Sequence, residues 1–515
     1  MHWKRYMALG DAEKRDEAYY IIGLDIGNDS SGIAFYNLAD GAPEPIDLSG
    51  GYGRPTIPTV AQYIAETKEW VFGEYAALNR GAGNESTFEG LIGRLGRNEY
   101  VDVGKKPVSV VSVLALYIRE LLGHVKNINP KAEIVGIVAS VPSYSNPQAR
   151  EDYARAFKQA GYEKELIALV SDRECVFSRH YAANAPKDET ILLLDYGSGE
   201  VRGGLYRAAP DASEIKMACM SSLFDDNIGT SRLNTEVEAM FKAFYLENSP
   251  DASGGEVSQI PSFAYMHRDM LFQKNIRSKP VKLYFNFAYP PFMQSVSHGR
   301  VMTMVKPYAE ALGRFVRDVL DKNLYSGETD AHKKVESVIC VGGGFEMLWA
   351  KETVCETFPG ICVAAYKNAK TVASEGAAVT AATLLGVASG KRFEIEDRHQ
   401  LKTDIGILSG GGFIPLVERN AFWWQKHPAK IMLLNEPCGG RIFIPIASRA
   451  SEGGIRRLAE LPLDGLPARP KGVTRLCATL SFQSDGEFSV TLSDCGFGEL
   501  FPKTDYTKEF NVKIA

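Results

Sequence analysis

Continuous runs of apolar residues, rich in β-branched side chains, recur along the first two thirds of the chain. Four of them lie at residues 19–27, 134–141, 191–194 and 335–341. Such runs are typical of strands that are buried on both faces of a parallel or mixed sheet. Helical patterns lie between them: one begins at Pro147 and is followed by Gly161, and Ser171 can cap another that reaches about Ala183. Alternating strands and helices predict an α/β domain.

Two of the apolar runs lead into similar turns. The segment DIGNDSSGIAFYN begins at Asp25, and the segment DYGSGEVRGGLYR begins at Asp195. Each continues a strand through Asp-x-Gly and a short polar turn into a return strand of small and aromatic residues. Two such units predict a duplicated domain with a cleft between its halves. The alternative is a chance similarity between two hairpins.

The pattern changes after Leu385. Residues 388–403 are polar and charged and indicate a linker. Beyond them, short apolar stretches alternate with turn signals such as Asp485-Gly486, which favours an antiparallel β-sandwich. The chain is therefore expected to divide into a polar extension at 1–18, an α/β domain at 19–387, a linker at 388–403 and a β-sandwich at 404–515.

Composition excludes several classes of function. With 58 basic and 63 acidic residues the net charge is -5, so we expect neither nucleic acid nor an anionic membrane as a partner. The eight cysteines form no CxxC pair and the eight histidines form no ligand-spaced cluster, which disfavours a zinc site and predicts reduced thiols. The N-terminus has no apolar core, and no apolar run is long enough to span a bilayer. A cytoplasmic protein is expected.

The first turn has the residues of a phosphate-binding loop. Backbone N–H groups that follow a strand can bind phosphate oxygens, and glycine allows a close approach. Gly27, Asn28, Asp29 and Ser30 occupy this position. Asp25, at the end of the strand, suits a hydrated Mg²⁺ ion, which takes one or two carboxylates and keeps several waters. A tight hairpin with a solvated carboxylate is the alternative, because Asp-x-Gly is a weak motif by itself.

The second turn repeats this chemistry with Asp195, Gly197, Ser198 and Gly199, so that two facing loops could hold two phosphates. A third glycine turn, VGGGFEM at 341–347, opens a helix and could bring backbone against an adenosine. The chain contains no GxxxxGK[ST], which disfavours a P-loop NTPase. No GxGxxG opens a helix, which disfavours a Rossmann dinucleotide site.

Together these three turns resemble the ATPase fold shared by actin, sugar kinases and the DnaK-type heat-shock chaperones. Further stretches narrow the resemblance to the DnaK family: RPTIPTVAQY at 54–63, SVPSYSNPQAREDYARAFKQAG at 140–161, SEGAAVTAATLLG at 374–386 and IGILSGGGFIPLVERN at 405–420. The resemblance covers nearly all of residues 19–500, and the order of the motifs makes it specific.

The resemblance implies an actin-like nucleotide-binding domain with two ribonuclease H-like halves at 19–387. It also implies a peptide-binding β-sandwich at 404–515 that lacks the family's helical lid. The implied cofactors are ATP or ADP with Mg²⁺. The implied partner is a client polypeptide or another protein, together with cochaperones.

The resemblance also gives roles to individual residues. It puts Asp25, Asp195 and Asp172 in the catalytic set, with Asp25 and Asp195 contacting Mg²⁺ through water. Pro142, Arg150 and Asp172 match residues that relay the nucleotide state between domains. Implied nucleotide contacts come from Gly27, Asn28, Asp29, Ser30, Gly197, Ser198, Gly199, Glu200, Gly229, Lys274, Gly342, Gly343, Gly344 and Glu346.

In the β-domain the resemblance implies a peptide groove lined by apolar side chains. These are Leu408, Phe413, Ile414, Leu416 and Val417. For each of them, an ordinary place in the sandwich core is the alternative.

The chain departs from the family pattern at positions that would support hydrolysis. Asn28 and Asp29 stand where the family has threonines, and Glu346 stands in place of an arginine that stacks on adenine. No lysine precedes the LIGR segment at 91–94, where Arg94 or Arg97 would have to substitute. Because phosphoryl transfer depends on positioning and electrostatics, we expect at most a weak ATPase.

The second loop departs in the same way. Glu200 replaces a threonine, and Arg202 replaces an aspartate. Arg202 could neutralise a phosphate, or it could point away from the loop, since alternate residues of a strand face opposite sides.

Other functions stay open beside a DnaK-like chaperone. The altered loops favour a non-catalytic, nucleotide-sensing assembly or regulatory module of the same fold. A small-molecule kinase and an actin-like filament are further alternatives, and the β-sandwich argues against both.

Overall fold

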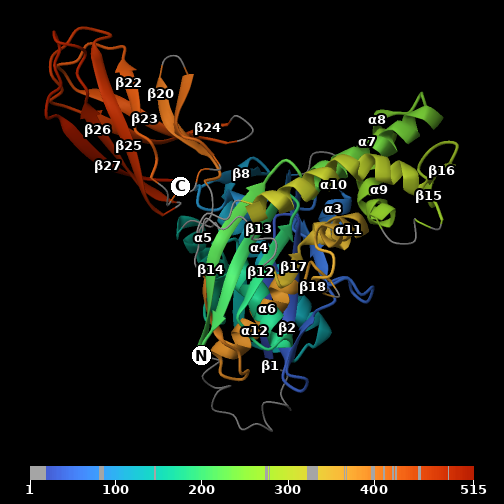
Figure 1. The fold of residues 1–515 in the computed structure, drawn as a ribbon. Helices are drawn as coiled ribbons and strands as arrows, with labels where there is room; N and C mark the ends of the chain where they lie inside the picture. The colour runs from blue at the N-terminus through green and yellow to red at the C-terminus, as the bar shows by residue number, and fades with distance from the viewer. Residues whose placement is uncertain are drawn as a thin grey trace. The chain divides into compact units, whose positions relative to one another are not determined.

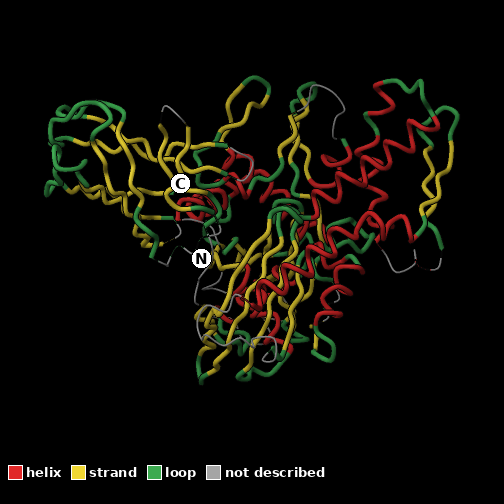
Figure 2. The backbone as a smooth tube through the Cα atoms, turned by 45° about the horizontal axis from the view of Figure 1, so that its top comes forward, coloured by secondary structure: helices red, strands yellow, loops and turns green. Residues whose placement is uncertain are grey.

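The computed structural model describes most of the chain. The described residues are 19–79, 86–143, 147–272, 277, 279–321, 335–364, 366, 368–395, 401–409, 412–419, 421, 423, 426–450, 454–484 and 486–514. The chain separates into two compact units, the first made of residues 1–145 and 149–396 and the second of 397–515 with 146–148. The first unit combines sheets and helices (Figure 1), and the second is built from strands and loops (Figure 2). Within the described ranges, no helix is long and apolar enough to cross a membrane.

One large sheet of the first unit contains the strands predicted at 19–27 and 134–141. Its order is β11-β10-β1-β2-β3, with β4 also paired to β2. The strands are β1 (Tyr19–Ile26), β2 (Ser30–Asn37), β3 (Ala42–Pro45), β4 (Thr56–Pro58), β10 (Glu133–Val141) and β11 (Leu166–Ser171). Because β1 is parallel to β10 and antiparallel to β2, the sheet is mixed.

A second large sheet contains the strands predicted at 191–194 and 335–341. Its order is β18-β17-β12-β13-β14-β19. The strands are β12 (Glu189–Tyr196), β13 (Val201–Pro210), β14 (Glu214–Asp225), β17 (Ser337–Val341), β18 (Cys362–Ala364) and β19 (Arg392–Ile395). Since β19 runs parallel to β14 at the sheet edge, part of the segment expected to be a linker is a strand of this sheet.

Shorter strands form three smaller sheets in the same unit. They are β6-β5-β7, β8-β9 and β15-β16. Their bounds are β5 (Ala61–Ile64), β6 (Glu69–Phe72), β7 (Ser86–Phe88), β8 (Tyr100–Val103), β9 (Lys106–Ser109), β15 (Val281–Phe285) and β16 (Phe292–Val296).

The helices between the strands confirm two predicted helix starts. Ser171 caps α6, since its Oγ accepts a hydrogen bond from the Glu174 N–H at 3.2 Å, and the helix predicted from Pro147 is α5. The described α-helices are α3 (Gly73–Leu78), α4 (Val110–Ile128), α5 (Pro147–Ala160), α6 (Asp172–Ala183), α7 (Thr230–Asn248), α8 (Gly254–Val257), α9 (Ile260–His267), α10 (His298–Asp321), α11 (Leu348–Thr357) and α12 (Val372–Leu384). Short 3₁₀ turns are η1 (Ile92–Arg94), η2 (Arg268–Phe272) and η5 (Gly343–Glu346).

Small residues let α12 pack closely against α6 and β1 (Figure 1). A Cβ atom at Gly376 would lie 1.7 Å from the backbone oxygen of Cys175 on α6. Only glycine can occupy this position without moving a helix. The contact fixes α6, which begins at Asp172, relative to the first sheet.

The second unit consists of two antiparallel sheets around one apolar core. Their orders are β21-β20-β23-β24 and β22-β25-β26-β27. The strands are β20 (Asp404–Ser409), β21 (Gly412–Val417), β22 (Lys430–Leu434), β23 (Ile442–Arg449), β24 (Ile455–Leu463), β25 (Thr474–Ser484), β26 (Glu487–Asp494) and β27 (Thr507–Lys513). Ile405 and Ile446 of one sheet are buried in the same cluster as Leu476 and Val490 of the other. The predicted antiparallel architecture is therefore confirmed.

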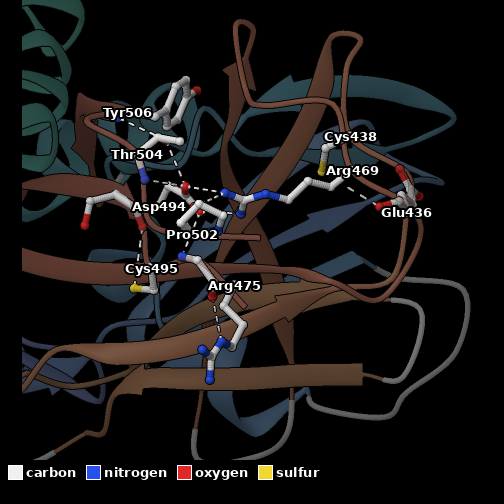
Figure 3. Close-up of polar contacts among 11 residues, drawn as sticks. Glu436, Cys438, Arg469, Arg475, Asp494, Cys495, Pro502, Thr504 and Tyr506 are labelled. Atoms are coloured by element: carbon white, nitrogen blue, oxygen red, sulfur yellow. Dashed lines mark hydrogen bonds and ion pairs between the residues drawn. The ribbon is translucent and has the colours of Figure 1, made fainter. Parts of the chain in front are cut away.

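A buried ion pair links the end of β26 to the loop between β24 and β25. The side chains of Arg469 and Asp494 are only 3% and 0% exposed, and they form two parallel hydrogen bonds of 2.7 and 2.8 Å (Figure 3). Asp494 also accepts hydrogen bonds from the backbone of Gly496 and from Thr504. Burial raises the pKa of Asp494, but these hydrogen bonds outweigh it and lower the pKa to about 2. The carboxylate is thus ionised and fully paired.

Replacing Arg469 by methionine should destabilise the second unit by about 3–5 kcal/mol, because Asp494 would keep a buried charge without its partner. Hydrogen exchange in the full chain would show this as lost protection of β25 and β26. The matched control is Arg457→Met, which breaks an exposed pair with Glu460 and should cost at most about 1 kcal/mol. Equal protection in the two variants would contradict a structural role for the buried pair.

Candidate functional site

The two Asp-x-Gly turns have the same geometry. The N–H of Gly27 donates to the Ser30 carbonyl at 3.0 Å, and the N–H of Gly197 donates to the Glu200 carbonyl at 2.9 Å. Each turn closes a hairpin, between β1 and β2 in one case and between β12 and β13 in the other. The similarity seen in the sequence is therefore a similarity of backbone structure.

Asp25 lies at the end of β1, beside β10. In the parallel register it is opposite Ser140, whose hydroxyl donates a short hydrogen bond to the Asp25 carboxylate. Burial raises the pKa of Asp25 to about 6; the Ser140 hydrogen bond opposes this rise, and the negative charge of Asp172 adds to it. The protonation of Asp25 therefore depends on the charge around it near neutral pH.

Asp195 occupies the corresponding place at the end of β12. Burial raises its pKa to about 7; the positive charge of Arg202 opposes the rise, while the negative charges of Asp172, Asp25 and Glu200 add to it. Four residues from three segments of the chain thus act on one carboxylate. The structure brings together all three residues of the predicted catalytic set.

The third glycine turn packs directly on the second. Gly342 has a φ of 91°, and a Cβ atom there would lie 2.5 Å from the Asp195 Oδ1 and 2.6 Å from the Tyr196 carbonyl oxygen. Glycine is therefore required both by the backbone conformation and by the close approach. Gly343 and Gly344 follow in η5.

The N-terminus of α7 holds the second turn from another direction. The N–H groups of Thr230 and Ser231 donate to the carbonyls of Gly197 and Ser198 at 3.1 and 2.9 Å. At Gly229, a Cβ atom would lie 2.3 Å from the Ser198 carbonyl oxygen. The second turn, with Gly199 at its exposed tip, is therefore fixed by backbone contacts on more than one side.

Several predicted residues contact protein backbone. Asn28 Oδ1 accepts a hydrogen bond from the Gly93 N–H at 2.9 Å, and the carbonyl of Asp29 accepts one from Thr59. Glu346 accepts a short hydrogen bond from the Ala369 N–H. These contacts tie the first turn to η1 and the third turn to the segment before α12.

The predicted relay residues lie around the start of α6. Pro142 follows β10, and the N–H of Ser143 donates to Asp172 Oδ1 at 3.2 Å. Arg150 on α5 lies near enough to Glu174 to oppose the rise in the pKa of Glu174 that burial causes. Lys274 lies outside the described residues.

The two candidate substitutes for the missing lysine are Arg94 and Arg97. The Arg94 guanidinium is paired with Glu99 at 2.6 Å, and Arg97 is exposed. Among the described residues, neither arginine is found in contact with Asp25 or Asp195.

Two residues near the turns were not predicted. Ser140 contacts Asp25 because β10 pairs with β1, and a parallel-strand alignment could have found it. Lys370 lies against the third turn, since a Cβ atom at Gly343 would be 2.9 Å from Lys370 Cε. No spacing in the sequence pointed to this lysine.

The predicted peptide contacts divide into two groups. Leu416 and Val417 are buried in the core of the second unit. Leu408 and Phe413 are paired across β20 and β21, and Ile414 is 46% exposed. The Arg449 guanidinium lies 4.7 Å from the Phe413 ring centroid, a cation–π contact. Only the second group is available to a ligand.

Two family profiles match parts of the chain. One is described as the C-terminal part of a family of unknown function, DUF5716, and covers residues 42–202. The other is described as a domain of unknown function, DUF8552, and covers residues 412–514.

Matches to characterised proteins extend over nearly the whole chain. The chaperone protein DnaK of Thermosipho africanus is 22% identical over 495 residues, which cover 93% of this chain and 79% of the relative. The chaperone protein DnaK of Thermotoga maritima is 24% identical over 501 residues, which cover 95% and 80%. The similarity is distant, but it includes both compact units in one alignment. The chain thus has distant, near full-length similarity to the DnaK chaperones of the heat-shock 70 kDa family, at a divergent level.

Proposed function

We propose that the first unit binds ATP or ADP and that the second binds polypeptide, with slow or absent hydrolysis of ATP. In this proposal the two large sheets are the ribonuclease H-like halves of an actin-like domain. The observation that carries it is the arrangement of the three glycine turns: two hairpins of equal geometry, and a third turn that packs on Asp195.

Nucleotide binding follows from what these turns offer. Turns that follow buried strands can present N–H groups to phosphate oxygens. The third turn places a backbone without side chains beside the second, where an adenosine can approach closely. Gly27, Asn28, Asp29 and Ser30 would contact phosphate from one side, and Gly197, Ser198, Gly199 and Glu200 from the other.

Slow hydrolysis follows from the surroundings of the two partly buried carboxylates, Asp25 and Asp195. Asp195, with a pKa of about 7, can accept a proton from water near neutral pH. Attack on a phosphate also needs its developing charge to be stabilised in a fixed geometry. Arg94, which is nearest in sequence to the family's lysine position, is held by Glu99 instead.

A chaperone role rests on the second unit and on the relatives, which are chaperone proteins DnaK. Leu408 and Phe413, which are paired across β20 and β21, and the neighbouring Ile414 are apolar side chains that are only partly buried. Such a group fits an extended polypeptide with apolar side chains. The charged contacts around Asp172 and Glu200 also favour a second candidate, a nucleotide-sensing module that does not hydrolyse ATP.

Single-turnover conversion of ATP, with protein in excess, tests the nucleotide part of the proposal. We expect ATP to bind and to be converted slowly or not at all, and Asp195→Asn to lower any conversion by about 100-fold or more, because it removes the proton acceptor. Asp47→Asn, in a separate loop of the same unit, is the control. Absence of ATP binding would overturn the proposal, and rapid conversion would overturn its statement on hydrolysis.

Fluorescence anisotropy with a labelled apolar peptide tests the second unit. Ile414→Asp should weaken binding by about tenfold or more, because it puts a charge into an apolar contact. Ile431→Asp is the matched control: Ile431 is 65% exposed on β22, an edge strand of the other sheet, and its replacement should leave the affinity unchanged. Equal losses in both variants would argue against a groove at β20 and β21.

The raised pKa values of Asp25 and Asp195 predict that the nucleotide-free protein loses stability as pH rises. Both folded-state pKa values, about 6 and about 7, exceed the ordinary 3.8, so the folded chain binds these protons more tightly than the unfolded chain. This contribution is fully present below about pH 4 and is lost as pH rises through about 6 to 7. The thermal midpoint should therefore fall between about pH 5 and pH 8, and Asp195→Asn should flatten that slope.

The control for this pH dependence is again Asp47→Asn. Hydrogen bonds from Ser49, Gly53 and Gly51 hold the pKa of Asp47 far below its usual range, so Asp47 is ionised throughout the window. Calorimetry of this variant should show a lower midpoint with the wild-type slope. An unchanged slope in Asp195→Asn would show that Asp195 is not the titrating group.

A further inference from the structure

Arg202 has a defined position beside Asp195. The two residues are directly opposite each other in the antiparallel register of β12 and β13. Side chains of directly opposed residues emerge on the same face, with Cβ atoms about 4.5–5.5 Å apart. Arg202 therefore points to the side of the sheet on which Asp195 lies, and the outward orientation left open by the sequence is excluded.

Two further acids hold the Arg202 guanidinium there. Its Nη1 lies 3.3 Å from Asp172 Oδ2 at the start of α6, and its Nε and Nη2 form short contacts with Glu200. The Arg202 side chain is 17% exposed, so these contacts are largely shielded from water. The guanidinium is the positive charge that opposes the rise in the pKa of Asp195.

The first hairpin has no such cation at the matching position. Asp25 is opposite Gly32 in the register of β1 and β2, as Asp195 is opposite Arg202 in the register of β12 and β13. The two hairpins thus share a backbone geometry but differ in charge: the second has Glu200 and Arg202 where the first has Ser30 and Gly32. The arginine is specific to the second half.

The charges around Asp195 and Arg202 do not suit a magnesium ion. Mg²⁺ in nucleotide sites keeps several waters, is held through one or two carboxylates and requires near-octahedral geometry. Here the carboxylates of Asp195, Asp172 and Glu200 face a guanidinium, which is always charged and would repel a divalent cation. Within the described residues, no group of three or more acidic, histidine or cysteine side chains is arranged to hold a metal ion.

We infer that Arg202 takes the place of the magnesium ion at the phosphate turns, so that the chain binds ADP or ATP without a divalent metal. This inference rests on the proposed nucleotide-binding function. An arginine fork binds phosphate oxygens through paired, charge-assisted hydrogen bonds. On binding, the phosphate replaces Glu200 as a partner of the guanidinium, while Asp172 keeps the arginine anchored to α6.

Calorimetric titration of the full chain with ADP tests this, once with excess Mg²⁺ and once with excess EDTA. We expect the wild-type Kd to differ by less than about threefold between the two conditions. Arg202→Gln should bind ADP at least about tenfold more weakly in EDTA and regain affinity when Mg²⁺ is added, because the carboxylates then lack a cation. Arg202→Lys, which keeps the charge, should still bind in EDTA.

The matched control is Arg207→Gln. Arg207 is on the same strand and is also paired with an acid, Asp188 at 2.7 Å, but at the other end of β13. Its replacement should leave both Kd values at wild-type level. Circular dichroism of each variant checks that the fold is retained.

Each failure has a separate meaning. Wild-type binding that is lost in EDTA overturns the inference and leaves the proposed function in place. Arg202→Gln binding in EDTA with wild-type affinity also overturns the inference. If the wild-type protein binds ADP in neither condition, the proposed function fails, and the inference fails with it.

Discussion

The arrangement of the first unit depends on the balance of charge at the ends of β1 and β12. Asp25 and Asp195 lie where two large sheets end, and burial favours the neutral form of each. Asp172 and Glu200 add negative charge to the same region. One arginine, fixed by strand register beside Asp195, offsets part of that charge. Without a cation, several carboxylates this close together could not all remain ionised in a shielded site.

Backbone geometry explains why this charge can be tolerated. The glycine turns bring main chain against main chain, as at Gly342 beside Asp195 and at Gly229 beside Ser198, and leave little room for side chains. The α12 helix is held against α6 by the same kind of contact at Gly376, which sets the position of Asp172. Close packing thus fixes acids that would otherwise move apart. Preorganised charge of this kind is what ligand sites require, and perturbed pKa values gather at such sites.

The sequence allowed part of this to be predicted. Apolar runs and capping residues were sufficient for the core strands, for α5 and α6, and for the two similar hairpins, because these depend on local periodicity. The contacts of Asp25 with Ser140 and of Arg202 with Asp172 join segments far apart in the chain, and local patterns do not encode such registers. The sequence left open toward which face of the sheet the Arg202 side chain points, because the two-residue period of a strand does not tell which of the two faces lies toward the turns. Strand β19 was not predicted, because its composition is polar and it is a strand only through its pairing with β14.

The buried carboxylate of Asp494 in the second unit and the partly buried carboxylate of Asp195 in the first have opposite surroundings. Asp494 is paired with Arg469 and accepts hydrogen bonds from three further groups, the backbone N–H of Gly496 and the backbone N–H and hydroxyl of Thr504, and its pKa is lowered. Because its carboxylate oxygens already accept these hydrogen bonds, Asp494 has little capacity to bind a ligand. The pKa of Asp195 is raised mainly by burial; the positive charge of Arg202, which also contacts Asp172 and Glu200, opposes the rise. Perturbed carboxylates of this kind gather at functional sites, and under the proposed function a nucleotide between the turns would be the further partner of this charge.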